Sequence, residues 1–300
     1  ILITTKRAKG RDAIVNVDIK VGVNQRAQQD YDYITDPGEY YEMHYKGLYN
    51  YYSQVAGLSS YEAHARANAT MLNPSAGSGS LGYNVYTLPE GQDLIGRNGK
   101  LNPQATLGRL INFKGEDYWV TPDNWIDEVY MNGIRQEYNV NVAAGNERGS
   151  FYGSFGYLNN DGIVENTGYE RYTARLRADY QAKKWLKVGA NFSYTNYDYN
   201  NGNSDEGSSS STGNIFAIAN QIAPIYPLYI RDAMGRKMID RYGFEMYDYG
   251  TGENAGAQRP YLANSNALQA AILDKNNSNG NAFNGSAYAE VKFLKDFTFT

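Results

Sequence analysis

The chain has 300 residues, a net charge of −4 and no cysteine. Without cysteine it has no disulfides and no thiolate metal sites, and its acidic balance, with no basic face, argues against a nucleic-acid partner. Tyrosine (29 residues) and glycine (31 residues) are abundant, and the mean hydropathy is −0.62. This composition favours β structure, because aromatic residues favour strands and glycine populates turns.

A short strand is predicted at Ile1-Leu2-Ile3-Thr4-Thr5, and the first clear alternation predicts a second strand over residues 12–24. Apolar side chains occupy every second position of this segment, at Val15, Val17, Ile19, Val21 and Val23. Polar residues alternate with them, among them Asn16, Asp18 and Lys20. A period of two over this length predicts a strand with one apolar and one polar face.

A long excursion follows, over about residues 28–135, and capping signals predict helices within it. Asp36-Pro37-Gly38-Glu39 opens a predicted helix that continues to about Tyr52. Ser59-Ser60-Tyr61-Glu62 is a capping box for a second helix, which we expect to stop before Asn73-Pro74. Thr121-Pro122-Asp123 opens a short predicted helix that ends at Val129.

Further strands are predicted at residues 137–146, 150–159, 169–182, 185–199, 286–293 and 297–300. Tight turns at residues 145–149, 183–184 and 295–296 join some of them. Aromatic residues on both faces of residues 150–158 leave the orientation of that segment open. A second long excursion, over about residues 200–284, contains predicted helices at 214–223 and 265–274 and a Ser/Gly-rich loop at 202–212.

The strand lengths and turns favour a transmembrane antiparallel β-barrel over a soluble β-sandwich. Soluble strands usually have about 5–6 residues, whereas a tilted membrane strand needs about 9–11, and several of these segments are longer still. Short turns at one end and long loops at the other are typical of outer-membrane barrels. The apolar faces carry Ala and Val with aromatic residues at their ends, as at a membrane interface. A soluble sheet with its polar face in water remains the alternative.

No pattern for catalysis or for metal or cofactor binding is found. Residues 77–82 match G-x-G-x-x-G, but they lack the preceding strand and following helix of a dinucleotide site. The two histidines, His44 and His64, each lie on a predicted helix and form no H-E-x-x-H arrangement. No convincing pair of carboxylates for glycan hydrolysis is present. We therefore expect no cofactor, no metal and no enzyme activity.

Several segments, in this order, resemble the SusC/RagA family of TonB-dependent transporters. They are Ile1-Leu2-Ile3-Thr4-Thr5-Lys6-Arg7, residues 35–42, Trp125-Ile126-Asp127-Glu128-Val129-Tyr130, residues 139–145, residues 152–163 with 171–179, and Ala223-Pro224-Ile225-Tyr226-Pro227-Leu228-Tyr229. One departure is Ala143-Ala144-Gly145, where the family more often has Ser-Gly-Gly.

The resemblance implies that the chain is an internal fragment of a longer protein in the bacterial outer membrane. Residues 1–11 would be the end of a plug domain and its linker, and residues 12–300 the N-terminal part of the barrel. About seven strands of a roughly 22-stranded barrel would lie in this chain. The family implies import of glycans or oligopeptides, with a SusD-like surface lipoprotein as partner and TonB acting through the part upstream of Ile1.

The predicted strand faces give candidate functional residues. The lumen-facing candidates are Asn16, Asp18, Lys20, Arg171, Arg175, Arg177 and Asp179. The three arginines with Asp179 could bind an anionic solute or form a charged wall against the plug. The two excursions would be extracellular and contact the lipoprotein or the substrate, where Trp119 is a candidate for stacking on sugars. Two rival functions are a passive porin or adhesin-type barrel, and a soluble secreted carbohydrate-binding β protein.

Overall fold

The computed structural model describes residues 12–27, 32–202, 215–254, 257–273, 275–294 and 297–300. The chain divides into two compact units. The strand unit comprises Ile1–Ala27, Tyr130–Gly202 and Asp274–Thr300, and the loop unit comprises Gln28–Val129 and Asn203–Leu273. The loop unit is therefore made of two long insertions into the chain of the strand unit.

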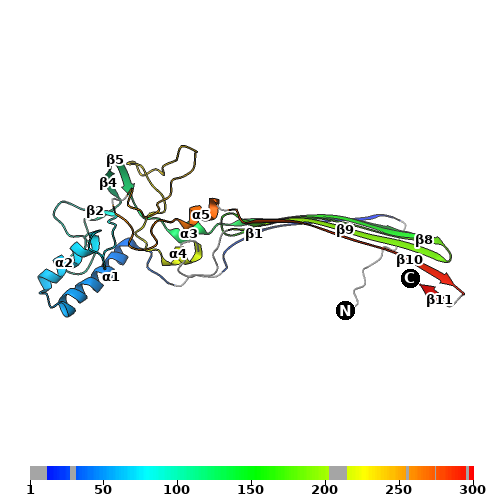
Figure 1. Ribbon diagram of the computed structural model, residues 1–300, viewed down its shortest axis with the longest axis horizontal. Coiled ribbons are helices and arrows are strands. Elements are labelled where there is room, and N and C mark those ends of the chain that lie inside the picture. The colour runs from blue at the N-terminus through cyan, green and yellow to red at the C-terminus, as the bar shows by residue number, and fades with distance from the viewer. Residues whose placement is uncertain (1–11, 28–31, 203–214, 255–256, 274, 295–296) are drawn as a thin grey trace. The chain divides into compact units, whose positions relative to one another are not determined.

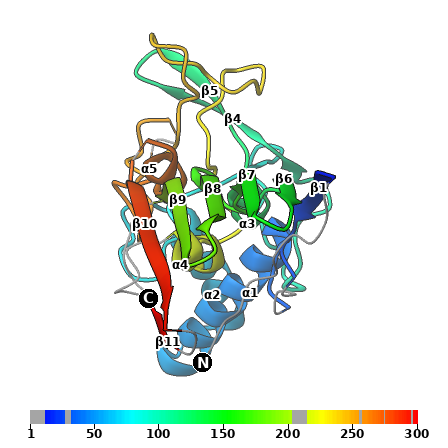
Figure 2. The ribbon, with the colours of Figure 1, turned by 90° about the vertical axis from the view of Figure 1, so that its right-hand side faces the viewer.

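The strand unit is one antiparallel sheet of seven strands, in the order β1-β6-β7-β8-β9-β10-β11 (Figures 1 and 2). The strands are β1 (Ile14–Asn24), β6 (Gly133–Gly145), β7 (Gly149–Asp161), β8 (Thr167–Lys183), β9 (Leu186–Asn201), β10 (Asn277–Phe293) and β11 (Phe297–Phe299). Each strand pairs with the strands that come before and after it in this sheet. Because neighbours are antiparallel, the short β6–β7 and β8–β9 turns lie at one end of the sheet, and the long insertions leave from the other.

The register sorts the side chains onto an apolar face and a polar face, because residues directly opposite each other in antiparallel strands share a face. One row of the polar face runs across six strands, through Asn16, Asn141, Ser154, Arg175, Ser193 and Asn284. The adjacent row of the apolar face contains Val15, Val142, Gly153, Leu176, Phe192 and Gly285. The orientation left open for β7 is settled, since Phe151, Phe155 and Tyr157 lie on the apolar face.

The apolar face is open rather than packed. Val17 in β1 is 62% exposed, and Phe155, Leu176, Phe192 and Phe283 on the inner strands are also exposed. In a water-soluble sheet such a row would be covered by a second layer. An apolar band of this size needs another cover, which lipid provides in a membrane barrel.

The loop unit contains five α-helices and two small strand pairs among its described residues. The helices are α1 (Pro37–Asn50), which continues as a π-helical turn (Tyr51–Val55), α2 (Ser60–Leu72), α3 (Trp125–Val129), α4 (Ile215–Gln221) and α5 (Ala267–Leu273). The strand pairs are β2 (Tyr86–Thr87) with β3 (Thr106–Leu107), and β4 (Arg109–Phe113) with β5 (Glu116–Val120).

Buried tyrosines form much of the core of the loop unit. Tyr83 and Tyr226 meet edge to face, with ring centroids 5.0 Å apart and planes at 88°. The hydroxyl of Tyr41 donates to the carbonyl of Tyr83 at 2.7 Å, and that of Tyr226 donates to the carbonyl of Leu81 at 2.8 Å. Their rings supply apolar packing while their hydroxyls satisfy loop carbonyls that have no strand partner.

The all-β fold with about seven strands and short helices in long connections is confirmed. Asp36 caps α1 through the backbone N–H of Glu39 at 2.7 Å, and Ser59 and Glu62 form the predicted capping box of α2. The helix expected from Thr121-Pro122-Asp123 begins only at Trp125, because Asn124 accepts the backbone N–H of Ile126 at 3.2 Å and Asp123 is engaged elsewhere.

Strand β10 is longer than the alternation predicted and begins at Asn277, so the excursion expected up to about residue 284 is shorter. The polar residues before Asn284 join the sheet because β9 offers partners: Asn281 accepts from Tyr194 and Asn196, and Phe283 stacks on Phe192. The predicted segments 1–5, 203–212 and 295–296 lie outside the described residues. Among the helices that the structure does describe, none has the length and apolar character to cross a membrane.

We expect an arginine on the apolar face to destabilise the barrel and an arginine beside it on the polar face to be tolerated. Ala287 and Ser286 are exposed neighbours on β10 that point to opposite faces. In the full-length protein in lipid vesicles, Ala287→Arg should lower the free energy of unfolding by about 2–4 kcal/mol if near the bilayer midplane. Ser286→Arg should change it little. Urea titration, with the folded fraction read from heat-modifiable gel mobility, measures the free energy of unfolding of both variants. Equal decreases in the two variants would contradict the assignment of the faces.

Candidate functional site

All seven candidate residues lie on the polar face. Asn16, Asp18 and Lys20 of β1 stand opposite Asn141, Asn139 and Glu137 of β6. Arg171, Arg175, Arg177 and Asp179 of β8 stand opposite Leu158, Ser154, Tyr152 and Ser150 of β7. The register connects these two groups through β6 and β7 into one continuous surface. That this surface lines the lumen of a barrel stays a prediction.

Asp179 forms a cluster near the short turns. Its side chain accepts hydrogen bonds from the hydroxyl of Ser150 at 3.2 Å and from Tyr288, and Nε of Arg177 lies 3.5 Å from it. The ring of Tyr288 covers Gly189, where any side chain would collide with it. Asp179 is consequently only 6% exposed, in a sheet whose other charged residues are more open. Sequence alternation placed Asp179 on this face but gave no sign of its partners on β7 and β10.

Four other charged residues of the polar face, Asp18, Lys20, Arg135 and Glu137, form pairs near the surface. The ammonium of Lys20 lies 3.4 Å from Asp18 and 3.6 Å from Glu137, and the guanidinium of Arg135 lies 3.1 Å from Glu137. Asn16 donates to Asn141 at 3.0 Å. Exposed pairs of this kind contribute little to stability, so their main effect is on the electrostatic potential along this face.

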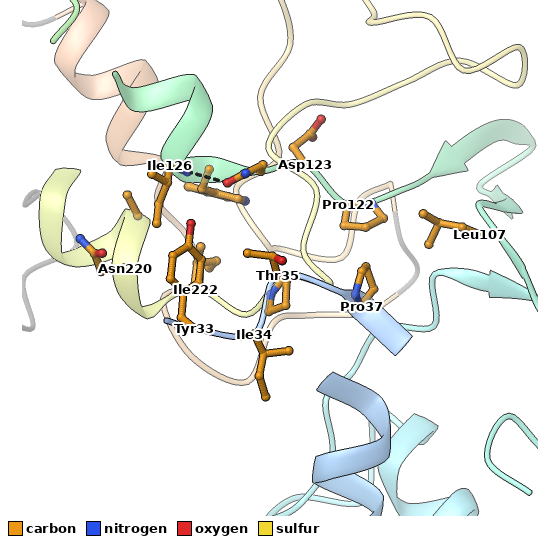
Figure 3. A pocket seen from close by; sticks show the side chains of 14 residues that line it. Tyr33, Ile34, Thr35, Pro37, Leu107, Pro122, Asp123, Ile126, Asn220 and Ile222 are labelled. Atoms are coloured by element: carbon orange, nitrogen blue, oxygen red, sulfur yellow. Dashed lines mark hydrogen bonds between the residues drawn. The ribbon is translucent and has the colours of Figure 1, made fainter. Parts of the chain in front are cut away.

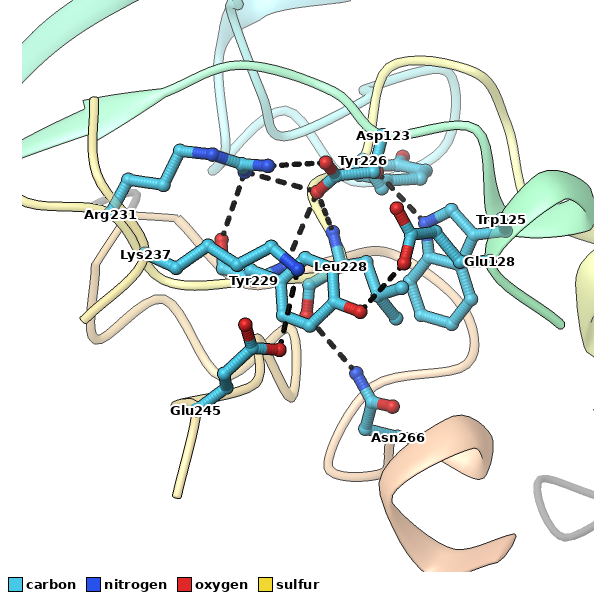
Figure 4. A network of polar contacts seen from close by, with 10 residues as sticks. All are labelled: Asp123, Trp125, Glu128, Tyr226, Leu228, Tyr229, Arg231, Lys237, Glu245 and Asn266. Atoms are coloured by element: carbon cyan, nitrogen blue, oxygen red, sulfur yellow. Dashed lines mark hydrogen bonds and ion pairs between the residues drawn. The ribbon is translucent and has the colours of Figure 1, made fainter. Parts of the chain in front are cut away.

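In the loop unit, Asp123 joins the two insertions (Figure 4). Its carboxylate accepts the backbone N–H of Leu228 at 2.7 Å and of Tyr229 at 3.3 Å, and it pairs with both terminal nitrogens of Arg231, one of them at 3.0 Å. The side chains of Asp123 and Arg231 are only 10% and 11% exposed. A forked ion pair that also satisfies backbone donors is among the stronger polar contacts in proteins.

Tyr229 extends this junction. Its hydroxyl donates to Glu128 at 2.8 Å, and Nζ of Lys237 lies 3.4 Å from its ring centroid. Burial raises the pKa of Tyr229, and the hydrogen bond to Glu128 raises it further. The phenol therefore stays protonated and keeps donating. Trp125 adds a hydrogen bond from its indole N–H to the carbonyl of Tyr226 at 3.0 Å. Sequence reasoning missed this junction, since its partners lie about a hundred residues apart.

A short repeat follows the junction and was also missed. Asp232 accepts the backbone N–H groups of Met234 and Arg236, and eight residues later Asp240 accepts those of Tyr242 and Phe244. Both turns contain a glycine with positive φ, Gly235 at 79° and Gly243 at 92°. The spacing Asp-x-x-Gly, twice at a period of eight, was a readable signal for two identical turns.

Trp119 lies half-buried on β5 in a packed position. Its indole covers Gly108, leaving no space for a side chain there, and also lies next to Gly235. Its backbone N–H donates to the carbonyl of Arg231 at 3.2 Å. These contacts pack Trp119 within the loop unit, and a role in stacking on sugars stays a prediction.

A pocket of about 210 Å³ opens between three segments of the loop unit, residues 33–37, 122–126 and 219–224 (Figure 3). Pro37, Pro122 and Ile222 give it a largely apolar lining. Among its polar groups, Asp123 forms an ion pair with Arg231, and the side chain of Asn220 donates to the carbonyl of Phe216 at 2.7 Å. We assign this pocket no ligand.

Both histidines take part in internal hydrogen bonds. Nε2 of His44 lies 2.6 Å from the carbonyl oxygen of Gly79. Nδ1 of His64 lies 2.7 Å from the hydroxyl of Tyr45, and its Nε2 lies 3.2 Å from Asp93. Within the described part of the chain, no three His, Asp or Glu side chains gather in an arrangement able to hold a metal ion.

A long-stranded antiparallel sheet with one open apolar face and one polar face is typical of a segment of a β-barrel. In sequence, the chain is 33% identical over 69 residues to TonB-dependent receptor P39 of Formosa agariphila, and 23% identical over 162 residues to TonB-dependent receptor P26 of the same organism. The matched stretches are 23% and 49% of this chain but only 7% and 16% of those relatives. No family model matches the chain.

In fold, the chain is similar to the RagAB peptide importer in its closed-closed state, with a TM-score of 0.54 at 16% identity. The match covers 98% of this chain and 28% of that one. The open-open state of the same importer also gives 0.54, at 15% identity. The resemblance to TonB-linked transporters of the SusC/RagA type is therefore confirmed. These relatives and structures are receptors and transporters rather than enzymes, in agreement with the expectation for this chain.

We expect the Asp123–Arg231 pair to hold the two insertions together. Asp123→Asn would leave a mostly buried guanidinium without its charge partner, a loss of about 3–5 kcal/mol. In the full-length protein, hydrogen exchange at the backbone amides of Leu228 and Tyr229 should rise at least about a hundredfold. Asp232→Asn is the matched control, because the Asp232–Arg236 pair is 31% and 71% exposed. Unchanged exchange at Leu228 in Asp123→Asn would contradict this role.

Proposed function

We propose that this chain forms part of the barrel wall and extracellular loops of a TonB-dependent outer-membrane transporter. The observation that carries the proposal is the fold, a sheet of long strands with long insertions, which aligns with the RagAB importer over 98% of this chain. The local sequence matches to TonB-dependent receptors support the same class. In this proposal residues 1–11 are the end of the plug and its linker, and residues 12–300 begin the barrel.

The apolar face would contact the lipid of the outer membrane, and the polar face the lumen. The seven candidate residues would then line the path of the solute or contact the plug. The transported solute would be a glycan or an oligopeptide, and a SusD-like lipoprotein would cover the loop unit from outside. The similarity to a peptide importer supports the oligopeptide, whereas the tyrosine- and asparagine-rich loops suit either solute.

The loop unit supports a role in contacts outside the membrane. It has a core of its own, with Tyr41, Met71, Tyr83 and Tyr226 almost completely buried. Exposed apolar side chains, among them Met234, Tyr242 and Phe244, project from its turns. A preformed unit of this kind can present a constant surface to a partner, because little ordering is needed on binding.

We expect uptake through the full-length protein to depend on TonB. Cells that express it should accumulate a labelled oligopeptide or oligosaccharide mixture, and deletion of TonB or collapse of the inner-membrane proton gradient should abolish accumulation. Mass spectrometry of the accumulated material identifies the solute class. Uptake that persists without TonB would indicate a passive porin, and recovery of the native protein in the soluble fraction would indicate a secreted binding protein.

A further inference from the structure

The polar face has a hollow of about 420 Å³, and Gly156 of β7 is part of its floor. A Cβ atom at Gly156 would lie 2.6 Å from Oδ1 of Asn139 and 2.7 Å from Oγ1 of Thr173. Both distances are shorter than Cβ contacts in proteins, so a side chain on this floor would have to push the ends of Asn139 and Thr173 aside. Tyr152, Arg171 and Arg175 line the hollow around this floor. Its size falls within the range of about 300–1,000 Å³ that is usual for small-molecule sites.

The hollow has an uncompensated positive charge. Arg171 and Arg175 both line it, and none of its described lining residues is acidic. Lys20, Arg135 and Arg177 on the same face each have a carboxylate partner. No such partner is present for Arg171 or Arg175 among the described residues, and Arg171 has only the ring of Tyr169, 5.9 Å from its guanidinium. Arginine favours carboxylates because its planar fork matches their two oxygens.

The remaining lining is neutral and polar. Ser154, Thr173 and Thr195 supply hydroxyls and Asn141 an amide, while Tyr152 supplies an aromatic ring. Two apolar residues also line the hollow, Val140 and Phe155, but they are paired with each other on the opposite face, so their side chains point away. The ring of Tyr152 is therefore the one large apolar surface in the described lining that an apolar peptide side chain could contact, whereas sugar hydroxyls would find several donors and acceptors.

From this combination we infer that the hollow binds a carboxylate-bearing sugar unit, a uronate, of a transported saccharide. The inference rests on the proposed function, because it needs the polar face to line a solute path. The arginines would hold the carboxylate, the hydroxyls and Asn141 would bind the ring hydroxyls, and Tyr152 would lie against the sugar ring. The site would then select acidic over neutral saccharides.

The test measures binding of trigalacturonate to the full-length protein in detergent by calorimetry, with the neutral trisaccharide galactotriose for comparison. Wild type should bind the acidic trisaccharide more tightly, and added salt should weaken that preference. Arg171→Gln and Arg175→Gln should each raise the Kd about tenfold or more, as expected for loss of a charged hydrogen bond. The matched control is Arg135→Gln, which removes the same charge from the same face outside the hollow and should leave the Kd unchanged.

A second variant tests the shape of the hollow without removing charge. Gly156→Val would fill the floor and should weaken trigalacturonate binding while both arginines remain. Heat-modifiable gel mobility shows whether this variant still folds. If it does not fold, the two arginine variants decide the result alone.

Four outcomes would overturn the inference. The first is no binding of trigalacturonate to wild type, and the second is equal binding by wild type and both arginine variants. The third is arginine-dependent binding of a triglutamate peptide but not of the saccharide. The fourth is loosening of the plug domain in the arginine variants while saccharide binding is unchanged. The last outcome would assign the arginines to a carboxylate within the protein. TonB dependence of uptake is measured separately. TonB-dependent uptake without binding of trigalacturonate would overturn this inference but would still support the proposed function.

Discussion

The register of the seven-stranded sheet is the constraint on which the rest of the strand unit depends. Side chains alternate with a period of two, so a slip of one residue between any two strands would carry a polar row onto the apolar face. Pairs such as Asn16 with Asn141 and Ser154 with Arg175 keep the rows in phase along the strands, and the described register shifts only beside the β8–β9 turn, between Gln181 and Lys183. Only with this phase can one side suit lipid and the other suit water.

The loop unit depends on a different constraint. Its irregular backbone lies outside the main sheet, so its N–H and C=O groups need hydrogen-bond partners from side chains. Asp123 is such a partner for the second insertion, accepting two of its backbone N–H groups while also holding Arg231. The same carboxylate therefore determines where the second insertion crosses the first. This also explains why α3 begins two residues after Asp123, since a carboxylate used for this crossing is not available as a helix cap.

Local signals made most of the fold predictable, and long-range contacts account for what was not. Alternation located the long strands other than β7, which was predicted as extended without a clear face, and the capping residues Asp36 and Ser59 located two helices. Both signals act within a few residues. The early start of β10 depended on partners in β9 such as Tyr194. The faces of β7, the burial of Asp179 and the Asp123 junction likewise depended on residues distant in sequence. The sequence was enough to assign the candidate residues to one face, but it did not predict which residues they would pair with.

Tyrosine shows why composition alone underdetermined the function. In the loop unit, Tyr41 and Tyr226 bury their rings and donate their hydroxyls to backbone carbonyls. On the polar face Tyr288 instead covers a glycine and binds the buried Asp179, and on the apolar face Tyr157 and Tyr172 pack on each other with centroids 4.8 Å apart. Each role uses an apolar ring that has one polar end. Such a side chain suits a protein core, a polar sheet face in contact with water, and an apolar face in contact with lipid. The position of a tyrosine in the register, and not its abundance, decides which of these roles it has.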